Sequence, residues 1–204
     1  MSVDGKRLLD LALASTAVVL LSPIFAILAC CGLLSSGRPI LFRQVRVGRH
    51  RTPFTLLKFR TMRPEKQLAS GGFTPGDRSR VTGFGRFLRR TKLDELPQLW
   101  SVIRGDMSLV GPRPEVPKWT EVYADRWDRV LTVRPGITDP ASIAFRDEES
   151  LLARAEDPER AYRDDILPKK LAMYEDYVAR RNLRLDIAIL AKTALALVVP
   201  RGPS

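Results

Sequence analysis

Apolar residues fill the chain almost without interruption from Leu8 to Leu34. A run of this length can span a bilayer as one straight helix. However, the pair Ser22-Pro23 lies near its middle. A proline there removes a backbone donor and bends the helix, and the serine hydroxyl can satisfy a freed backbone group. The pattern therefore predicts a helix, a break and a second helix.

The charges beside this run indicate how it meets a membrane. Lys6 and Arg7 precede it, and Arg38, Arg43 and Arg46 follow it. Because positive residues favour the cytosolic side, both ends are expected there, with Asp10 at the interface. We predict a re-entrant membrane hairpin over residues 1–35. An ordinary transmembrane helix and a cleaved signal peptide are the competing interpretations; Asp10 and the length of the run fit a signal peptide poorly.

The next segment has a different period. Residues 39–47 alternate partly between apolar and polar, 48–52 form a turn signal, and 54–61 are a second strand candidate. This predicts an antiparallel β-hairpin with Arg and Lys on one face. Lys58 and Arg60 are interleaved with apolar residues, so we expect these two charges to point at a specific target.

Helical spacing returns at Leu96, Leu99, Trp100 and Ile103. The adjacent carboxylates Asp94 and Glu95 therefore lie near the start of an amphipathic helix, just after a dense basic run. Ionised carboxylates in such a place can act as a nucleophile or hold a divalent metal. Ordinary helix capping is the competing interpretation, since Thr91 and Asp94 fit a capping box.

The remaining pattern predicts loops and two further helices. Loops or turns are expected at residues 64–78, 105–114 and 134–138, tight packing and a helix start at 83–86, and helices at 169–181 and 184–199. Prolines on both sides of Arg113 preorganise its guanidinium for phosphate or pin its own loop. The fold class is thus α+β and mostly helical, with amphipathic helices at the membrane interface.

The composition of the chain indicates the chemical class of its partner. The 204 residues carry a net charge of +11 and a single histidine. Such a balance indicates an anionic partner: nucleic acid, an anionic membrane surface or phosphorylated substrates. Residues 139–165 are locally acidic, either as a solvated face or as a balance to the basic core. Cys30 and Cys31 are adjacent in sequence and are expected to be free thiols.

Several longer motifs together resemble the monotopic phosphoglycosyl transferase superfamily, the bacterial sugar transferases that begin glycan assembly on a polyprenol carrier. The matching pieces, in chain order, are Ser22-Pro23, residues 42–48, 58–62 and 80–82, Leu93-Asp94-Glu95-Leu96-Pro97-Gln98-Leu99, residues 105–114 and Pro135-Gly136-Ile137-Thr138. The resemblance runs from the N-terminus to the last helix. It implies that residues 36–204 form a cytosolic catalytic domain at the membrane interface.

The resemblance also implies a reaction. A UDP-sugar would donate a phosphosugar to a polyprenol phosphate such as undecaprenyl phosphate, releasing UMP, as the first membrane step of a bacterial glycan. Asp94 matches the nucleophile, and Glu95 matches the ligand of Mg²⁺, or of Mn²⁺ in its place. Matches to the phosphate and nucleotide site are Lys58, Arg60, Arg89, Arg113 and Arg146. The resemblance places the protein at the cytoplasmic leaflet of the bacterial inner membrane, in contact with its lipids. It implies no nucleic-acid partner and leaves a homodimer possible.

Two single positions and one four-residue segment depart from the usual motifs. Lys92 stands where a serine is usual, Ser101 where an asparagine is usual, and Asp139-Pro140-Ala141-Ser142 replaces a glycine-led continuation. The last change bears on the sugar and on Arg146. The hypothesis from another class is a non-catalytic basic module that binds anionic lipid or nucleic acid. A third is an inactive scaffold, against which the retained Asp94-Glu95 pair argues.

Overall fold

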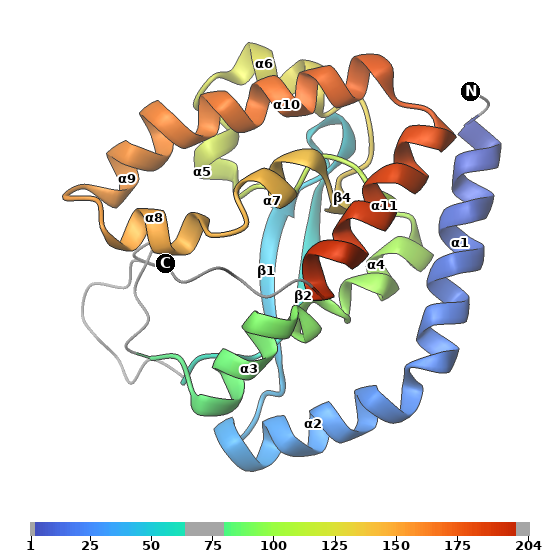
Figure 1. The fold of residues 1–204 in the computed structure, drawn as a ribbon, viewed down its shortest axis with the longest axis vertical. Coiled ribbons are helices and arrows are strands. Elements are labelled where there is room, and N and C mark those ends of the chain that lie inside the picture. Colours follow the sequence, from blue (N-terminus) through green and yellow to red (C-terminus); the bar gives the residue numbers. More distant parts are fainter. Residues whose placement is uncertain (1–2, 64–79, 199–204) are drawn as a thin grey trace.

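The computed structural model describes residues 3–63 and 80–198. Helices surround two small strand pairs (Figure 1), which confirms a mostly helical α+β class. The expected loop at 64–78 lies outside the described residues. The α-helices are α1 Val3–Leu20, α2 Ser22–Ser36, α3 Gly83–Thr91, α4 Gln98–Arg104, α5 Pro117–Thr120, α6 Ala124–Val130, α7 Pro140–Ala144, α8 Glu148–Ala153, α9 Pro158–Ala161, α10 Leu167–Arg180 and α11 Leu183–Val198. Strands are β1 Leu41–Val47, β2 Pro53–Phe59, β3 Ser108–Val110 and β4 Gly136–Thr138.

The predicted break in the apolar run is present. Helix α1 ends at Leu20, and α2 begins at Ser22 with Pro23 in its first turn. Ser22 Oγ donates a hydrogen bond to the carbonyl of Val19 at 2.8 Å. Within the described residues no single helix has the length and apolarity to cross a bilayer. The two segments Gly5–Leu20 and Ser22–Ser36 meet that requirement together, with a bend of 61° between them.

The start of α1 is fastened to the rest of the chain by polar groups. Asp10 is only 5% exposed, and its carboxylate accepts from Ser108 Oγ at 2.7 Å and from the Leu109 amide at 3.1 Å. Arg7 donates to the carbonyls of Val102 and Ile103 at the end of α4, where a helix leaves carbonyls unpaired. The partners of Asp10 are thus protein groups, and its expected depth at the membrane interface stays a prediction. Its side chain holds β3.

Strands β1 and β2 form the predicted antiparallel hairpin, with Phe42 opposite Lys58 and Arg43 opposite Leu57. Opposed residues share a face, and successive residues alternate. Lys58 and Arg46 therefore lie on one face, whereas Arg43 lies on the other. The prediction that the basic residues share one face is wrong for Arg43, because the strand period separates positions 43 and 46.

A second strand pair was missed by the sequence pattern. Strands β3 and β4 pair in parallel, with Ser108 opposite Gly136 and Val110 opposite Thr138. We expected a loop and a turn there, but three-residue strands are too short to show a period. The two backbones approach closely at Gly111 and Gly136. Glycine is needed there, since a Cβ on Gly136 would collide with the backbone of Gly111. This pairing fixes the position of the segment after β3, which carries Arg113.

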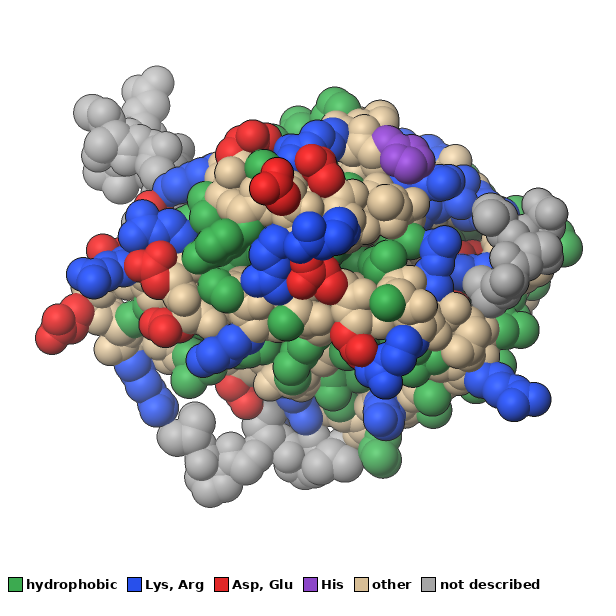
Figure 2. All heavy atoms as spheres, turned by 90° about the horizontal axis from the view of Figure 1, so that it is seen from above, with side chains coloured by type: hydrophobic (Ala, Val, Ile, Leu, Met, Phe, Trp, Pro, Cys, Tyr) green, Lys and Arg blue, Asp and Glu red, His purple; other side chains and the backbone are tan. Residues whose placement is uncertain are grey.

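The two C-terminal helices are close to their predicted ranges. Helix α10 buries Leu171 and Tyr174 in a core cluster with Trp127 of α6. Helix α11 packs Ile189 into a second cluster with Leu99 and Val102 of α4. On the face above α6 and α10, basic and acidic side chains lie side by side (Figure 2), and the pairs of Arg126 and Arg129 with Glu175 belong to these helices.

Candidate active site

A sharp change of backbone direction presents Asp94 and Glu95. Helix α3 ends at Thr91, and Lys92 takes a left-handed conformation with φ of 59°. A single 3₁₀ turn, Leu93–Glu95, then carries both carboxylates, and α4 begins after Pro97. The predicted capping box is wrong. Thr91 belongs to the preceding helix and donates to the carbonyls of Phe87 and Leu88.

Glu95 lies between two cations from different parts of the chain. Arg113 Nη2 is 2.6 Å from Glu95 Oε1, and Lys58 Nζ is 3.0 Å from the same oxygen. Arg113 Nη1 also reaches Oε2 at 3.3 Å, so the guanidinium contacts both oxygens. Burial opposes ionisation of this carboxyl, but Arg113 and then Lys58 outweigh it and hold the pKa of Glu95 well below its usual value. Glu95 is therefore anionic at neutral pH.

Asp94 has a different environment, although it is the adjacent residue. It is 7% exposed, and its Oδ1 is buried without a hydrogen-bond partner. Burial raises the pKa of Asp94, with Lys58 acting in the opposite direction and Glu95 reinforcing the rise. Burial likewise lowers the pKa of Lys58. Asp94 is thus a carboxylate with an uncommitted oxygen next to a cation, as a nucleophile requires.

The other predicted basic residues do not contact Glu95 directly. Arg89 donates to Thr61 Oγ1 at 2.9 Å and pairs with Glu149 at 2.7 Å. Arg60 follows β2 and has one buried terminal nitrogen without a partner. Arg146 follows α7 and is half-buried. The structure therefore brings together Asp94, Glu95, Lys58 and Arg113.

Three neighbouring residues were not among the predicted site residues: Thr61, Asp139 and Glu149. Of these, the sequence connected Asp139 with the site, as part of the altered segment 139–142. Asp139 is fully buried and caps α7 by accepting from the Ser142 amide at 2.8 Å. Its charge also contributes to raising the pKa of Arg113. An aspartate directly before a proline is a recognisable helix start, so the sequence held this signal. The acidic excess at 139–165 partly balances basic residues, as Glu149–Arg89 and Glu148–Lys170 show.

Comparison with known proteins identifies the family. The family described as bacterial sugar transferase matches residues 2–200. The chain belongs to this family. A relative in Bacillus subtilis strain 168, the uncharacterised sugar transferase EpsL, is 37% identical over 197 residues, covering 97% of this chain and 89% of the relative.

Other bacterial sugar transferases carry a named activity. The UDP-glucose:undecaprenyl-phosphate glucose-1-phosphate transferase of Caulobacter vibrioides is 34% identical over 196 residues, covering 95% of this chain and 69% of the relative. The Escherichia coli K12 protein of that name is 40% identical over 193 residues, covering 92% of this chain but only 39% of the relative. These relatives support the phosphoglycosyl transferase resemblance seen in the sequence.

Asp94 and Glu95 are the carboxylates of this sugar transferase site that could hold a metal ion together with substrate phosphates. The described residues contain no group of three His, Cys, Asp or Glu side chains that could hold a metal. Mg²⁺ is commonly bound by one or two carboxylates together with substrate phosphates. The adjacent pair Asp94 and Glu95, with the unpartnered Oδ1, fits that kind of site.

Proposed function

We propose that this protein transfers a phosphosugar from a UDP-sugar to a polyprenol phosphate such as undecaprenyl phosphate. The products are UMP and a polyprenol diphosphosugar, which starts a bacterial surface glycan. Family membership and the named activities of the relatives support the reaction class. The observation that carries the proposal is the buried Asp94 oxygen beside a carboxylate held by two cations.

The proposed chemistry has two displacements at one phosphorus. An Asp94 carboxylate oxygen attacks the sugar-bearing phosphorus of the donor, and the bond from that phosphorus to the bridging oxygen breaks. UMP leaves with that oxygen, and a phosphosugar ester of Asp94 is formed. An oxygen of the lipid phosphate then attacks the same phosphorus and displaces the Asp94 carboxylate, which is regenerated. This path splits one difficult transfer into two steps.

Attack by an anion on an anionic diphosphate needs positive charge around the phosphates. Lys58 and Arg113 supply it, and Glu95 keeps both of them in place. Glu95, with Asp94 adjacent, would hold Mg²⁺, or Mn²⁺ in its place. The metal would offset phosphate charge when bound. Arg60, Arg89 and Arg146 are proposed to contact the donor, as their positions in the family motifs imply.

We also propose that the α1–α2 pair enters one leaflet and returns, so that the remaining residues face the cytosol at the inner membrane. The two arms contact the same body of the protein. Lys6, Arg7 and Asp10 hold the start of α1, and Leu28 of α2 packs on Phe59 and Leu88. Because both helices contact the same domain, a spanning arrangement with the ends of the pair on opposite sides of a bilayer would break one of these contacts.

UMP release tests the proposed reaction. Purified protein is assayed with Mg²⁺, polyprenol phosphate and a panel of UDP-sugars, alongside Asp94→Asn. Release with one sugar, abolished in the variant and by chelation, is the expected result. Transfer of radiolabelled sugar phosphate to wild-type protein without acceptor would mark the covalent intermediate. If Asp94→Asn released UMP at the wild-type rate, the assignment of the nucleophile would be wrong.

The proposed topology has its own test. In a background in which Cys30 and Cys31 are replaced by serine, single cysteines are placed at Gly5 and Ser35, both exposed residues. A membrane-impermeant thiol reagent should label both positions from the cytosolic side of inverted vesicles and neither from the outside of intact cells. Labelling from opposite sides would establish a spanning segment and refute re-entry.

A further inference from the structure

A second concentration of positive charge lies away from the Asp94–Glu95 cluster. It lines a cavity of about 220 Å³ between the start of α1, strand β3 and the end of α10. We call this space the basic cavity; its charged lining residues are Lys6, Arg7, Asp10, Arg49, Arg134 and Arg181. It shares no residue with the group formed by Asp94, Glu95, Lys58 and Arg113.

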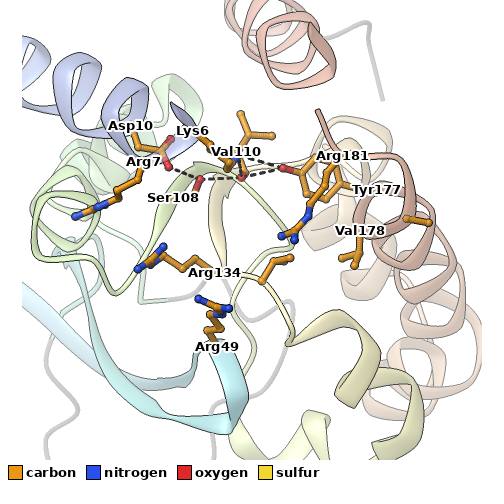
Figure 3. A pocket seen from close by; sticks show the side chains of 12 residues that line it. Lys6, Arg7, Asp10, Arg49, Ser108, Val110, Arg134, Tyr177, Val178 and Arg181 are labelled. Carbon is orange, nitrogen blue, oxygen red and sulfur yellow. Dashed lines mark hydrogen bonds between the residues drawn. The ribbon is translucent and has the colours of Figure 1, made fainter. Parts of the chain in front are cut away.

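Three arginines of the basic cavity, Arg7, Arg49 and Arg134, are held in place by backbone carbonyls. Arg134 Nε donates to the carbonyl of Gly105 at 2.8 Å, and Arg49 Nε donates to that of Thr132 at 3.1 Å. Each terminal nitrogen of Arg7 donates one hydrogen bond to a carbonyl at the end of α4. A guanidinium has five N–H donors, so each of these groups keeps donors free. Figure 3 shows the nitrogen ends of Arg49, Arg134 and Arg181 around the same space, whereas that of Arg7 is turned toward α4.

The charges of the basic cavity are poorly balanced by its own carboxylates. Asp10 is the acidic residue among its lining, and it already accepts from Ser108 and Leu109. Lys6 is paired with Asp186 at 2.5 Å. Among the described residues, Arg7, Arg49, Arg134 and Arg181 form no ion pair. Guanidinium groups that line one cavity without a carboxylate partner repel one another, and an anion bound between them would relieve that repulsion.

We propose that the basic cavity is a second anion site, which binds a phosphate or diphosphate group. Several guanidinium groups around one space match phosphate geometry, because each can donate two parallel hydrogen bonds. The volume of the basic cavity favours a phosphate or diphosphate group over a complete nucleotide sugar. Pockets for whole small ligands usually measure roughly 300–1,000 Å³. The group can belong to a soluble phosphate compound or to a lipid headgroup. Bound there, it links α1 to β3 and α10.

Binding measurements on the purified full-length protein test this site. Inorganic pyrophosphate is titrated calorimetrically without divalent metal, and dihexanoyl phosphatidylglycerol is titrated in parallel, with dihexanoyl phosphatidylcholine as the neutral-headgroup reference. The variant is Arg49→Gln with Arg181→Gln, both exposed residues that should not affect folding. The control, Arg154→Gln with Arg160→Gln, removes the same charge at the exposed region of α8 and α9.

We expect the Arg49/Arg181 variant to bind at least one phosphate probe about tenfold or more weakly than the control, as expected for losing charge-assisted hydrogen bonds. A loss confined to pyrophosphate identifies a soluble ligand, and a loss confined to phosphatidylglycerol identifies a headgroup. If variant and control bind both probes equally, or wild-type protein binds neither, the proposal is overturned. The test does not depend on turnover, so it stands apart from the proposed reaction.

Discussion

Arg113 contacts both carboxylate oxygens of Glu95, at 2.6 and 3.3 Å. The two residues lie on different elements, one in the 3₁₀ turn before α4 and one after β3. Their pair joins the segment that carries the proposed nucleophile to the segment fixed by the β3–β4 pairing. The same arginine is thus both a structural link and a proposed phosphate contact.

Replacing Arg113 by glutamine should therefore affect stability and activity together. Removing one partner of a buried ion pair costs about 3 kcal/mol or more, and we expect the lower end because Lys58 still pairs with Glu95. Chemical denaturation in detergent measures the free energy of unfolding, and UMP release measures activity. Arg113→Lys keeps the charge but loses the two-point contact. It should recover most of the stability but not the activity; full recovery of both would show that only charge matters.

Activity should depend on pH with two limbs. The proposed nucleophile must be ionised, so activity rises as pH increases through the pKa of Asp94, which burial places above its usual value. Lys58 must be protonated, so activity falls as pH increases through its pKa, which burial places below its usual value. A pH profile of UMP release under saturating donor should therefore be narrower than ordinary Asp and Lys values would give.

Lys58→Arg provides the control for this profile. Arginine does not titrate in the accessible range, so any remaining activity should keep the acidic limb and lose the alkaline limb. An alkaline limb unchanged in the variant would assign that limb to another group.

The sequence predicted the parts of the fold in which a hydrophobic pattern continues over a long segment. The break at Ser22-Pro23, the hairpin of β1 and β2, and helices α10 and α11 all follow from patterns of seven residues or more. The β3–β4 pair could not be predicted, because each strand has three residues and their partners are far apart in sequence. Its position is set by the close approach of Gly111 and Gly136, a tertiary contact.

The sequence named the residues that cluster in the candidate site, but it did not predict which acid pairs with which base. Asp94, Glu95, Lys58 and Arg113 were all named from motifs, and the structure brings them together. The partner of Arg89 is Glu149, which lies in a segment that composition described only as acidic. Charge balance indicates that such pairs exist, but only the packing of α8 against the rest of the fold decides which acid meets which base.

The close packing of α3 on the segment after β2 gives a stability prediction with a matched control. A Cβ on Gly85 would collide with the carbonyl of Thr61, whereas a Cβ on Gly83 would lie 3.8 Å from the nearest side-chain atom, on Arg86. Gly85→Ala should therefore destabilise by about 1–3 kcal/mol, the usual cost of overpacking. Gly83→Ala should be neutral or slightly stabilising, because alanine favours helix. Equal unfolding midpoints for the two variants would refute the close contact.

The attachment of α1 to α11 leads to the last prediction. Asp186 is 2% exposed; one carboxylate oxygen is 2.5 Å from Lys6 Nζ, and the other accepts from Tyr177 at 2.7 Å. Asp186→Asn preserves shape but leaves the Lys6 charge without its partner, so we expect a loss of roughly 3 kcal/mol in the free energy of unfolding.

Asp176→Asn is the control, because Asp176 is exposed and pairs with exposed Arg180, a contact worth less than about 1 kcal/mol. Denaturation of the two variants, with limited proteolysis of the N-terminal segment, separates a local from a global effect. Because Lys6 holds the start of α1, Asp186→Asn should also expose that segment to protease before the core unfolds. If both variants lost the same small amount, Lys6–Asp186 would contribute no more than a surface pair, and α1 would be held by Arg7, Asp10 and its apolar packing against α4.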